Sequence, residues 1–333
     1  MILIFSDKTD YSTQFVCDWL DHFHANYVII YPEHKIDLDS LLIQNGKIEF
    51  NLEISNLINQ ERKIIAFSKI TSVWFRRGFL NLNKVSFKEI TSKNSDYGNE
   101  LLNFHLKEYK TITEFVYETL VRYKKILGNP FKFDINKLTM LMIAQEFGLS
   151  IPQTLITTKK ARLIDFLNKS NDGIITKGIQ NGFNFEQNDD FHFTYTEQVK
   201  VEDMEKIDEM FFYSLFQYRI IKKFEIRTFF INNTFFSMVV HSQDNPKTET
   251  DFRKYDDINP NKVEPFTLPK KVESKLRKVF NYFNLNTGSI DIIVDQKDKY
   301  IFLEINPVGQ FGMVSSPCNY MLEKIIASYL IEK

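Results

Sequence analysis

The chain has 333 residues, of which 43% are hydrophobic and 26% are charged, as in globular proteins with a large buried core. Its 42 basic and 43 acidic residues give a net charge of -1, so no global positive field favours nucleic acid or an anionic membrane. No apolar run approaches the roughly 20 residues that span a bilayer, and the chain turns polar too soon after "MILIF" for a signal peptide. Cys17 and Cys318 have no metal or redox spacing, and a reducing cytoplasm is the simplest setting for them. Together with the charge and the absence of long apolar runs, this predicts a cytoplasmic protein without a membrane or nucleic-acid partner.

The first third of the chain predicts a small α/β unit. Short apolar runs predict strands, Asn45-Gly46 predicts a hairpin with a type I′ turn, and Gly128 with Pro130 ends the segment. In chain order, the predicted elements are strands at 1–5 and 26–32 around a helix at 11–23, a hairpin over 41–54, a strand ending at Arg76 and Arg77, and a helix over about 100–125.

The other two thirds predict a larger α/β module without internal repeats. In chain order, its predicted elements are a helix over 135–148, a strand over 173–177 that enters a loop with Gly178 and Gly182, a helix over 204–215, two strands over 225–240 joined at Asn232-Asn233, and a helix over 270–283.

The segment "GSIDIIVDQKDKYIFLEIN" predicts two antiparallel strands joined by a polar turn. Strand alternation places Glu304 and Asn306 on one face of the second strand, and Leu303 on the opposite, apolar face. A turn centred on Lys297 and Asp298 sets the cross-strand pairs, which are Asp291 with Glu304, Ile293 with Phe302, and Asp295 with Tyr300.

The pairing of Asp291 with Glu304 predicts a metal site. Directly opposed side chains have Cβ atoms about 4.5–5.5 Å apart, so two carboxylates placed there repel each other. A shared divalent cation removes this conflict, and Asn306 adds a neutral oxygen on the same face. Such an all-oxygen set suits Mg²⁺ or Mn²⁺. The alternative is that one carboxylate is solvated or salt-bridged.

Further polar residues extend this set, although each is weak evidence alone. Lys177 stands where a strand enters a glycine-containing loop, whose backbone N–H groups can bind phosphates, and Lys137 opens a helix. Glu225 and Arg227 alternate with apolar residues in "KKFEIRTFF", so they face away from the apolar side. Taken alone, the two lysines and Arg253 in "TDFRKYD" read more simply as surface charges.

Taken in order, these motifs resemble the ATP-grasp superfamily, and within it the ligases that add glutamate to ribosomal proteins. In that branch the chain resembles the microviridin-type peptide macrocyclases, or graspetide ligases, and their grasp-with-spasm relatives. The resemblance covers nearly the whole chain and rests on "VWFRRG", "GNPF", "NKLTMLMIAQEFGLSIPQTLIT", "IITKG", "YTEQV", "FEIRTFFINNTFFSMVVHSQ", "TDFRKYD", "SIDIIV" and "FLEINPVGQFG".

The resemblance implies an α/β protein with the ATP-grasp fold. It implies an N-terminal α/β (pre-ATP-grasp) domain at residues 1–127 and a nucleotide held between two α+β subdomains at 128–216 and 217–333. The backbone of the hinge at 217–220 would read adenine. The loop after Lys177 departs from the family pattern, because it lacks the dense glycines of many superfamily members.

Residue roles follow from the same resemblance, and they fall into three groups. The implied ATP-binding residues are Lys137, Lys177, Gln217, Tyr218, Arg219, Ile220 and Glu225, of which Glu225 would bind the ribose. The implied catalytic residues are Lys177, Arg227 and Arg253. The implied ligands of Mg²⁺ are Asp291, Glu304 and Asn306.

The implied activity is that of an ADP-forming ligase. It would activate Asp or Glu side chains of a ribosomally made precursor peptide as acyl phosphates and join them to Thr or Ser hydroxyls or to Lys amines. One alternative is a ligase that adds a free amino acid to a carboxylate of a protein or small molecule. Another is a nucleotide-binding module without turnover.

A peptide substrate implies a docking groove for its leader segment. The stretch "FHFTYTEQV" predicts an edge hairpin that could accept this segment, and an ordinary hairpin covering the nucleotide is the alternative. For Arg76 and Arg77 two interpretations are open: each would face the acceptor carboxylate or the nucleotide, or form a structural salt bridge. The resemblance further implies a homodimer.

Overall fold

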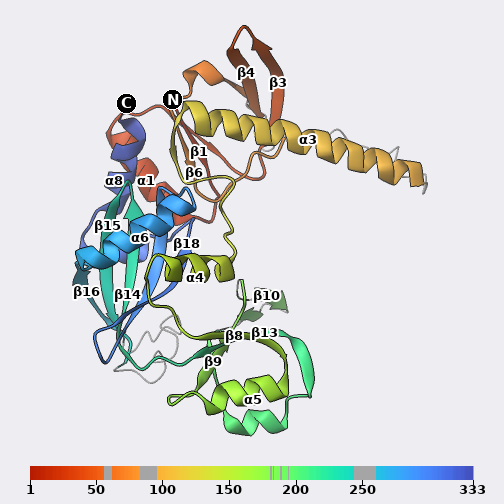
Figure 1. Ribbon diagram of the computed structural model, residues 1–333. Helices are drawn as coiled ribbons and strands as arrows, with labels where there is room; N and C mark the ends of the chain where they lie inside the picture. The colour runs from red at the N-terminus through yellow and green to blue at the C-terminus, as the bar shows by residue number, and fades with distance from the viewer. Residues whose placement is uncertain are drawn as a thin grey trace. The chain divides into compact units, whose positions relative to one another are not determined.

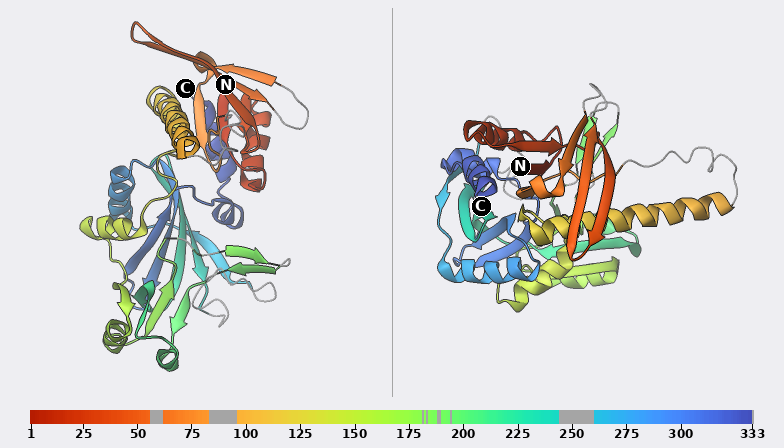
Figure 2. Two further views of the ribbon diagram at one scale, coloured as in Figure 1. Left: turned by 90° about the vertical axis from the view of Figure 1, so that its right-hand side faces the viewer. Right: turned by 90° about the horizontal axis from the view of Figure 1, so that it is seen from above.

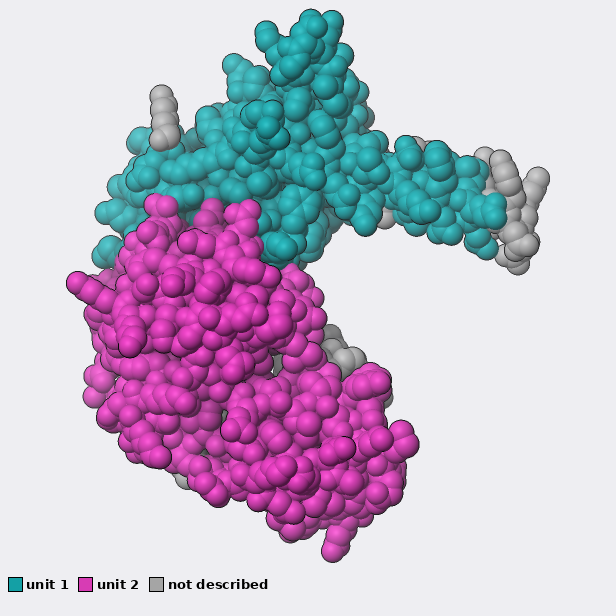
Figure 3. Space-filling model, in the orientation of Figure 1, with its two compact units in different colours: residues 1–133, 321–333 teal, residues 134–320 magenta. Residues whose placement is uncertain are grey.

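The computed structural model describes residues 1–55, 62–82, 96–180, 182, 184–187, 190–193, 195–243 and 260–332. These residues form two compact units, which are shown in two colours in Figure 3. Unit 1 comprises residues 1–133 and 321–333, and unit 2 comprises residues 134–320. In the described part of the chain, no helix is both long and apolar enough to cross a membrane.

Unit 1 is built on a parallel sheet with the strand order β2-β1-β6-β7 (Figure 1). These strands are β1 (Ile2–Phe5), β2 (Tyr27–Ile30), β6 (Ser72–Phe75) and β7 (Lys125–Leu127). The helices α1 (Tyr11–His22) and α8 (Leu322–Ile331) pack against each other. The hydroxyl of Ser72 donates to the carbonyl of Leu330 at 2.6 Å, so the last helix folds with the N-terminal residues.

A second, antiparallel sheet and one long helix complete unit 1. The sheet consists of β3 (Lys35–Gln44), β4 (Lys47–Ser55) and β5 (Arg62–Ala66), and a short 3-10 helix η1 (Phe67–Lys69) follows. The predicted turn at Asn45-Gly46 is confirmed, since both residues have positive φ, of 51° and 74°. The helix α3 (Asp96–Tyr123) extends well beyond the parallel sheet, and its Tyr117 ring packs edge-on against Phe5 and Phe75 (Figures 1 and 2).

Unit 2 begins with a four-stranded sheet in the order β12-β9-β13-β8. Its elements are β8 (Thr154–Lys159), α5 (Lys160–Asn168), β9 (Ile174–Lys177), β12 (Glu197–Val199), the 3-10 helix η2 (Val201–Glu205) and β13 (Met210–Tyr218). The predicted helix over 204–215 is wrong. The aromatic run of "MFFYSLFQY" favours a strand, and pairing with β8 on one side and β9 on the other fixes β13 in that form.

The predicted edge hairpin around "FHFTYTEQV" is confirmed only for the first three residues of the stretch. A separate two-stranded sheet pairs β10 (Asn184–Gln187) with β11 (Asp190–Phe193). The strand β12, which ends the stretch, pairs instead with β9. The stretch is therefore divided between two sheets.

The second large sheet of unit 2 has the order β16-β15-β14-β17-β18. Its strands are β14 (Lys222–Ile231), β15 (Thr234–His241), β16 (Lys262–Phe266), β17 (Thr287–Asp295) and β18 (Tyr300–Asn306), and α7 (Gly312–Cys318) follows them. The helices α4 (Lys137–Glu146) and α6 (Lys270–Tyr282) cover one face of this sheet (Figure 1). They bury an apolar core in which the ring centroids of Phe230 and Phe280 lie 4.1 Å apart. The predicted turn at Asn232-Asn233 is confirmed, with φ of 43° and 67°.

The β17–β18 hairpin keeps the predicted register only at the end distant from its turn. There, Asp291 pairs with Glu304 as predicted. Toward the turn the pairs shift by one residue, to Ile292 with Phe302, Ile293 with Ile301, and Val294 with Tyr300. Leu303 is the extra residue of a bulge, and bulges change the side to which the following residues point. Leu303 consequently lines the same cavity as Glu304, and its predicted place on the opposite face is wrong.

Candidate active site

Unit 2 contains a cavity of about 330 Å³, and both of its large sheets contribute residues to the lining. Every sequence-predicted site residue in the described part of the chain lines this one cavity; these residues are Lys137, Lys177, Gln217, Tyr218, Arg219, Ile220, Glu225, Arg227, Asp291, Glu304 and Asn306. Arg253, the remaining predicted catalytic residue, lies outside the described residues.

Charged side chains form a row across three neighbouring strands. Arg227 on β14 is directly opposite Asp291 on β17, which is directly opposite Glu304 on β18. Nη1 of Arg227 lies 2.6 Å from each carboxylate oxygen of Asp291, and Nζ of Lys137 lies 2.8 Å from Oε2 of Glu304. Each carboxylate thus has its own side-chain cation, which relieves the repulsion that the sequence predicts.

The surroundings of Glu304 favour its ionised form. Burial alone would raise the pKa of this carboxyl, but the nearby cations, Lys137 foremost, hold the pKa below its ordinary value. The side chains of Lys137 and Glu304 are each 25% exposed, so this pair is accessible from the cavity. The site therefore presents an ionised carboxylate at neutral pH.

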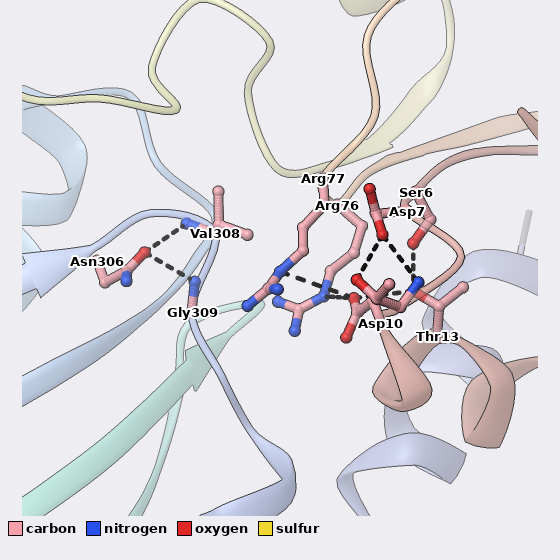
Figure 4. A network of polar contacts seen from close by, with 10 residues as sticks. Ser6, Asp7, Asp10, Thr13, Arg76, Arg77, Asn306, Val308 and Gly309 are labelled. Carbon is pink, nitrogen blue, oxygen red and sulfur yellow. Dashed lines mark hydrogen bonds and ion pairs between the residues drawn. The ribbon is translucent and has the colours of Figure 1, made fainter. Parts of the chain in front are cut away.

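Asn306 lies one pleat beyond Glu304, and a turn holds its side chain. Its Oδ1 accepts hydrogen bonds from the backbone N–H groups of Val308 and Gly309, both at 3.2 Å (Figure 4). Gly309 has φ +49°, and a Cβ there would lie 2.6 Å from the backbone nitrogen of Ser289. Only glycine fits this close approach, so the turn that orients Asn306 depends on it.

The chemistry of these residues fits a magnesium ion. Two carboxylates and one amide from adjacent strands line the same cavity and offer the oxygen ligands that Mg²⁺ prefers. Among the residues that the structure describes, no three His, Cys, Asp or Glu side chains gather in a metal-binding group. The amide of Asn306 would be a third protein donor beside Asp291 and Glu304, with water and phosphate oxygens completing the coordination.

The two predicted phosphate-binding lysines lie at element ends. Lys177 is the last residue of β9, and Lys137 is the first residue of α4, which Asn136 caps. The side chain of Gln180 joins these regions, since its Oε1 accepts from the backbone N–H of Lys137 at 3.1 Å and its Nε2 donates to the carbonyl of Ile135 at 2.8 Å. Sequence reasoning missed Gln180, because nothing in "KGIQNG" signals a contact more than forty residues away.

The residues predicted to form a hinge, 217–220, continue from the end of β13. Backbone N–H groups of Tyr218 and Arg219 donate to the carbonyls of Gln153 and Gly173, at 3.0 and 2.9 Å. These bonds connect the predicted hinge to the residues directly before β8 and β9.

Glu225, predicted to bind ribose, is buried with two hydrogen-bond donors. Nζ of Lys222 lies 2.8 Å from its Oε1, and the hydroxyl of Ser242 donates to the same oxygen at 2.7 Å. Burial raises the pKa of Glu225, and both donors oppose this rise. Lys222 was also missed, because residues three apart in a regular strand face opposite sides; a bulge at Lys223 brings it beside Glu225.

The paired arginines after β6 belong to unit 1. Nε of Arg76 donates to Oδ2 of Asp10 at 2.7 Å, and both side chains are buried (Figure 4). Nε of Arg77 lies 4.0 Å from the same oxygen, and its side chain is 35% exposed. Of the two interpretations of these arginines, the structural salt bridge therefore holds for Arg76.

No protein-family model matches the chain, and no curated protein matches it. Solved structures do match it over nearly its full length. The RiPP-associated ATP-grasp ligase of Chryseobacterium gregarium, in complex with ADP and a leader and core peptide, is 24% identical with a TM-score of 0.74, and the match covers 99% of this chain and 94% of that one.

Two further structures have the same architecture. The macrocyclase MdnC of Microcystis aeruginosa MRC, bound with the precursor peptide MdnA, is 24% identical with a TM-score of 0.74, over 100% of this chain and 99% of that one. The ATP-grasp ligase PsnB, complexed with a minimal precursor, Mg and ADP, is 16% identical with a TM-score of 0.68, over 99% and 96%. The protein therefore has the ATP-grasp fold, as its sequence predicts.

Proposed function

We propose that the protein is an ATP-dependent peptide macrocyclase. It activates Asp or Glu side chains of a ribosomally made precursor peptide and joins them to Thr or Ser hydroxyls or to Lys amines, with ADP and phosphate as products. The observation that carries this proposal is one cavity in an ATP-grasp fold that gathers Lys137, Lys177, Arg227 and the oxygen donors of β17 and β18.

The proposed reaction has two steps. A carboxylate oxygen of the peptide attacks the γ-phosphorus of ATP, and the bond from that phosphorus to the ADP oxygen breaks. The hydroxyl or amine then attacks the acyl carbon of the resulting acyl phosphate, phosphate leaves, and the nucleophile loses its proton to solvent. Neither step needs a serine or cysteine nucleophile from the protein.

The protein's part is to position the reactants and neutralise charge, which is how phosphoryl transfer is generally catalysed. Lys137 and Lys177 bind phosphate oxygens, and Arg227 and Arg253 stabilise the charge of the group in transfer. Asp291, Glu304 and Asn306 would hold Mg²⁺, which when bound neutralises phosphate oxygens further, and Mn²⁺ has similar oxygen preferences.

The partners of the protein follow from the same proposal. The structures solved with ADP and precursor peptides support a peptide substrate that carries a leader segment. We extend the proposal to a cytoplasmic homodimer. We also place the nucleotide between the subdomains at 128–216 and 217–333, because both contribute to the cavity lining.

Mass spectrometry tests the function. The protein is incubated with ATP, Mg²⁺ and the short peptide encoded beside its gene. Loss of one water per bond, with no added residue, is the expected result. A gain of one amino-acid residue would instead indicate a ligase that adds free amino acids, and ATP binding without any peptide-stimulated ADP release would indicate a module without turnover.

A further inference from the structure

Two of the residues that would hold Mg²⁺ already contact cations of the protein. Oε2 of Glu304 lies 2.8 Å from Nζ of Lys137, and both carboxylate oxygens of Asp291 lie 2.6 Å from Nη1 of Arg227. Of the described residues that line the cavity, five are lysines or arginines and three are carboxylates. A divalent cation that entered alone would therefore meet neutralised carboxylates and a surplus of positive charge, which repels it.

The two ion pairs differ in how easily they separate. The side chains of Lys137 and Glu304 are each 25% exposed, whereas those of Arg227 and Asp291 are 13% and 20% exposed. Solvent screens an accessible ion pair, so that such a pair shifts an equilibrium by about fivefold at most. Lys137 is therefore the cation that can leave its carboxylate at the lower cost in free energy.

The backbone of Lys137 is held in place, so a change of partner involves only its side chain. Its N–H donates to Oε1 of Gln180 at 3.1 Å, and Oδ1 of Asn136 accepts from the next two N–H groups of α4, both at 3.0 Å. These acceptors occupy the first N–H groups of the helix, which are therefore not available to a phosphate. The ammonium is at the end of a flexible four-carbon chain and can reach a second acceptor while the helix stays fixed.

We propose that Lys137 is an exchangeable counter-cation of Glu304. While the nucleotide is absent, its ammonium neutralises this carboxylate and opposes the entry of a free divalent cation. When ATP and Mg²⁺ bind together, the ammonium moves from Glu304 to a phosphate oxygen, and Glu304 becomes available as a metal ligand. The inference rests on the proposed function, which supplies ATP and Mg²⁺, and extends it to the way in which the site is filled.

The exchange keeps the charges of the site balanced. Glu304 gives up a single positive charge and becomes free to contact a divalent one, and Lys137 gives up a carboxylate and gains a phosphate oxygen. Without a polyphosphate, a divalent cation on Glu304 would leave the ammonium beside it with no anion. The nucleotide and the metal must therefore raise each other's affinity by the same factor, because coupling between two ligands is reciprocal.

Electron paramagnetic resonance tests the inference on the full chain without nucleotide, because the signal of free Mn²⁺ reports how much of the added ion is bound. Lys137→Met keeps the length of the side chain and removes its charge, so this variant should bind Mn²⁺ about fivefold or more tightly than the wild type. In isothermal titration calorimetry with Mg²⁺, the same variant should bind ATP about tenfold or more weakly, since it lacks the phosphate contact. A general loss of structure would weaken both ligands and cannot produce shifts of opposite sign.

Two further variants locate the effect. Lys137→Met combined with Glu304→Gln should lose the gain in Mn²⁺ affinity, because the carboxylate that Lys137→Met leaves without its cation is then absent. Lys297→Met makes the same change of charge in the exposed turn between β17 and β18, and it should bind both Mn²⁺ and ATP as the wild type does.

Mn²⁺ binding by Lys137→Met that is unchanged or weaker would overturn the inference, and so would unchanged ATP affinity in that variant. A gain in Mn²⁺ affinity that persists without the Glu304 carboxylate, or that Lys297→Met shows equally, would also overturn it. The two proposals can fail separately. The expected shifts without peptide cyclisation would sink the proposed function and support the exchange, whereas cyclisation with unchanged Mn²⁺ binding in Lys137→Met would do the reverse.

Discussion

Replacing Glu304 by Gln tests whether this carboxylate works as a metal ligand or only as a structural partner of Lys137. The substitution keeps the size of the side chain and removes its charge. In the structure, the charge is balanced by Lys137 at 2.8 Å, and Lys177 and Arg227 also contribute to the lowered pKa of Glu304. The two roles predict effects of different size on stability and on turnover.

The cost in stability should be small. Both side chains of the Lys137–Glu304 pair are 25% exposed, so solvent screens the pair, and such pairs contribute about 1 kcal/mol at most. For a chain of 333 residues, that corresponds to a fall of about 1–2 °C in Tm. Loss of a metal ligand that stabilises transferring charge should instead lower turnover roughly 100-fold or more.

Two measurements separate the roles. Differential scanning fluorimetry with ATP, with and without Mg²⁺, should show that Glu304→Gln loses the stabilisation that Mg²⁺ adds and keeps the stabilisation from ATP alone. Peptide-stimulated ADP release by Glu304→Gln should fall roughly 100-fold or more. The control is Glu264→Gln on β16, which is exposed at the far edge of the same sheet and should behave as the wild type. Wild-type turnover by Glu304→Gln would refute the metal assignment.

Three further outcomes are expected. Lys177→Ala should weaken ATP binding about tenfold or more by calorimetry, and unchanged affinity would exclude a phosphate contact. Asp10→Asn should destabilise the protein by about 3–5 kcal/mol in urea unfolding at pH 7, because it removes the charge that compensates buried Arg76. Burial opposes ionisation of Asp10, but Arg76 lowers the pKa of this carboxyl on balance. The stability difference between Asp10→Asn and the wild type should therefore be complete above the unfolded pKa of about 4 and fade as the pH falls further. A stability difference that grows in acid would contradict a lowered pKa for Asp10. Gly128→Ala should cost about 2–4 kcal/mol in the same assay, since Gly128 has φ +82° and a Cβ there would lie 2.4 Å from the carbonyl oxygen of Phe75; an unfolding midpoint equal to that of the wild type would disprove the clash.

The parts of the site that local spacing decides could be predicted from the sequence. Lys137 opens its helix because Asn136 caps it. Asp291 was correctly predicted to be opposite Glu304, but the turn alone does not produce this pair: the register near the turn differs by one residue from the prediction, and the bulge at Leu303 offsets that difference. The long-range partners could not be predicted. Gln180 reaches Lys137 across more than forty residues, and no local pattern records that contact.

Bulges and an ambiguous apolar run account for most of the remaining errors. One extra residue at Leu303 and another at Lys223 reverse the alternation of side chains, and neither is a Gly or Pro that would signal it. The segment that forms β13 combines apolar residues with no clear period, so helix and strand cannot be separated until its two neighbouring strands are known.

The bulge at Leu303 also affects how related chains should be compared with this one. Near the turn, Ile301 is opposite Ile293, which lines the cavity, and counting on from Ile301 in steps of two arrives at Leu303 and Ile305. Counting back from the Pro–Val–Gly corner in steps of two arrives at Asn306 and Glu304 instead. A homologue that is one residue shorter in this strand would therefore keep its carboxylate over the cavity only if the missing residue lay on the turn side of Glu304. Any alignment of this strand should be anchored at the Gly309 corner.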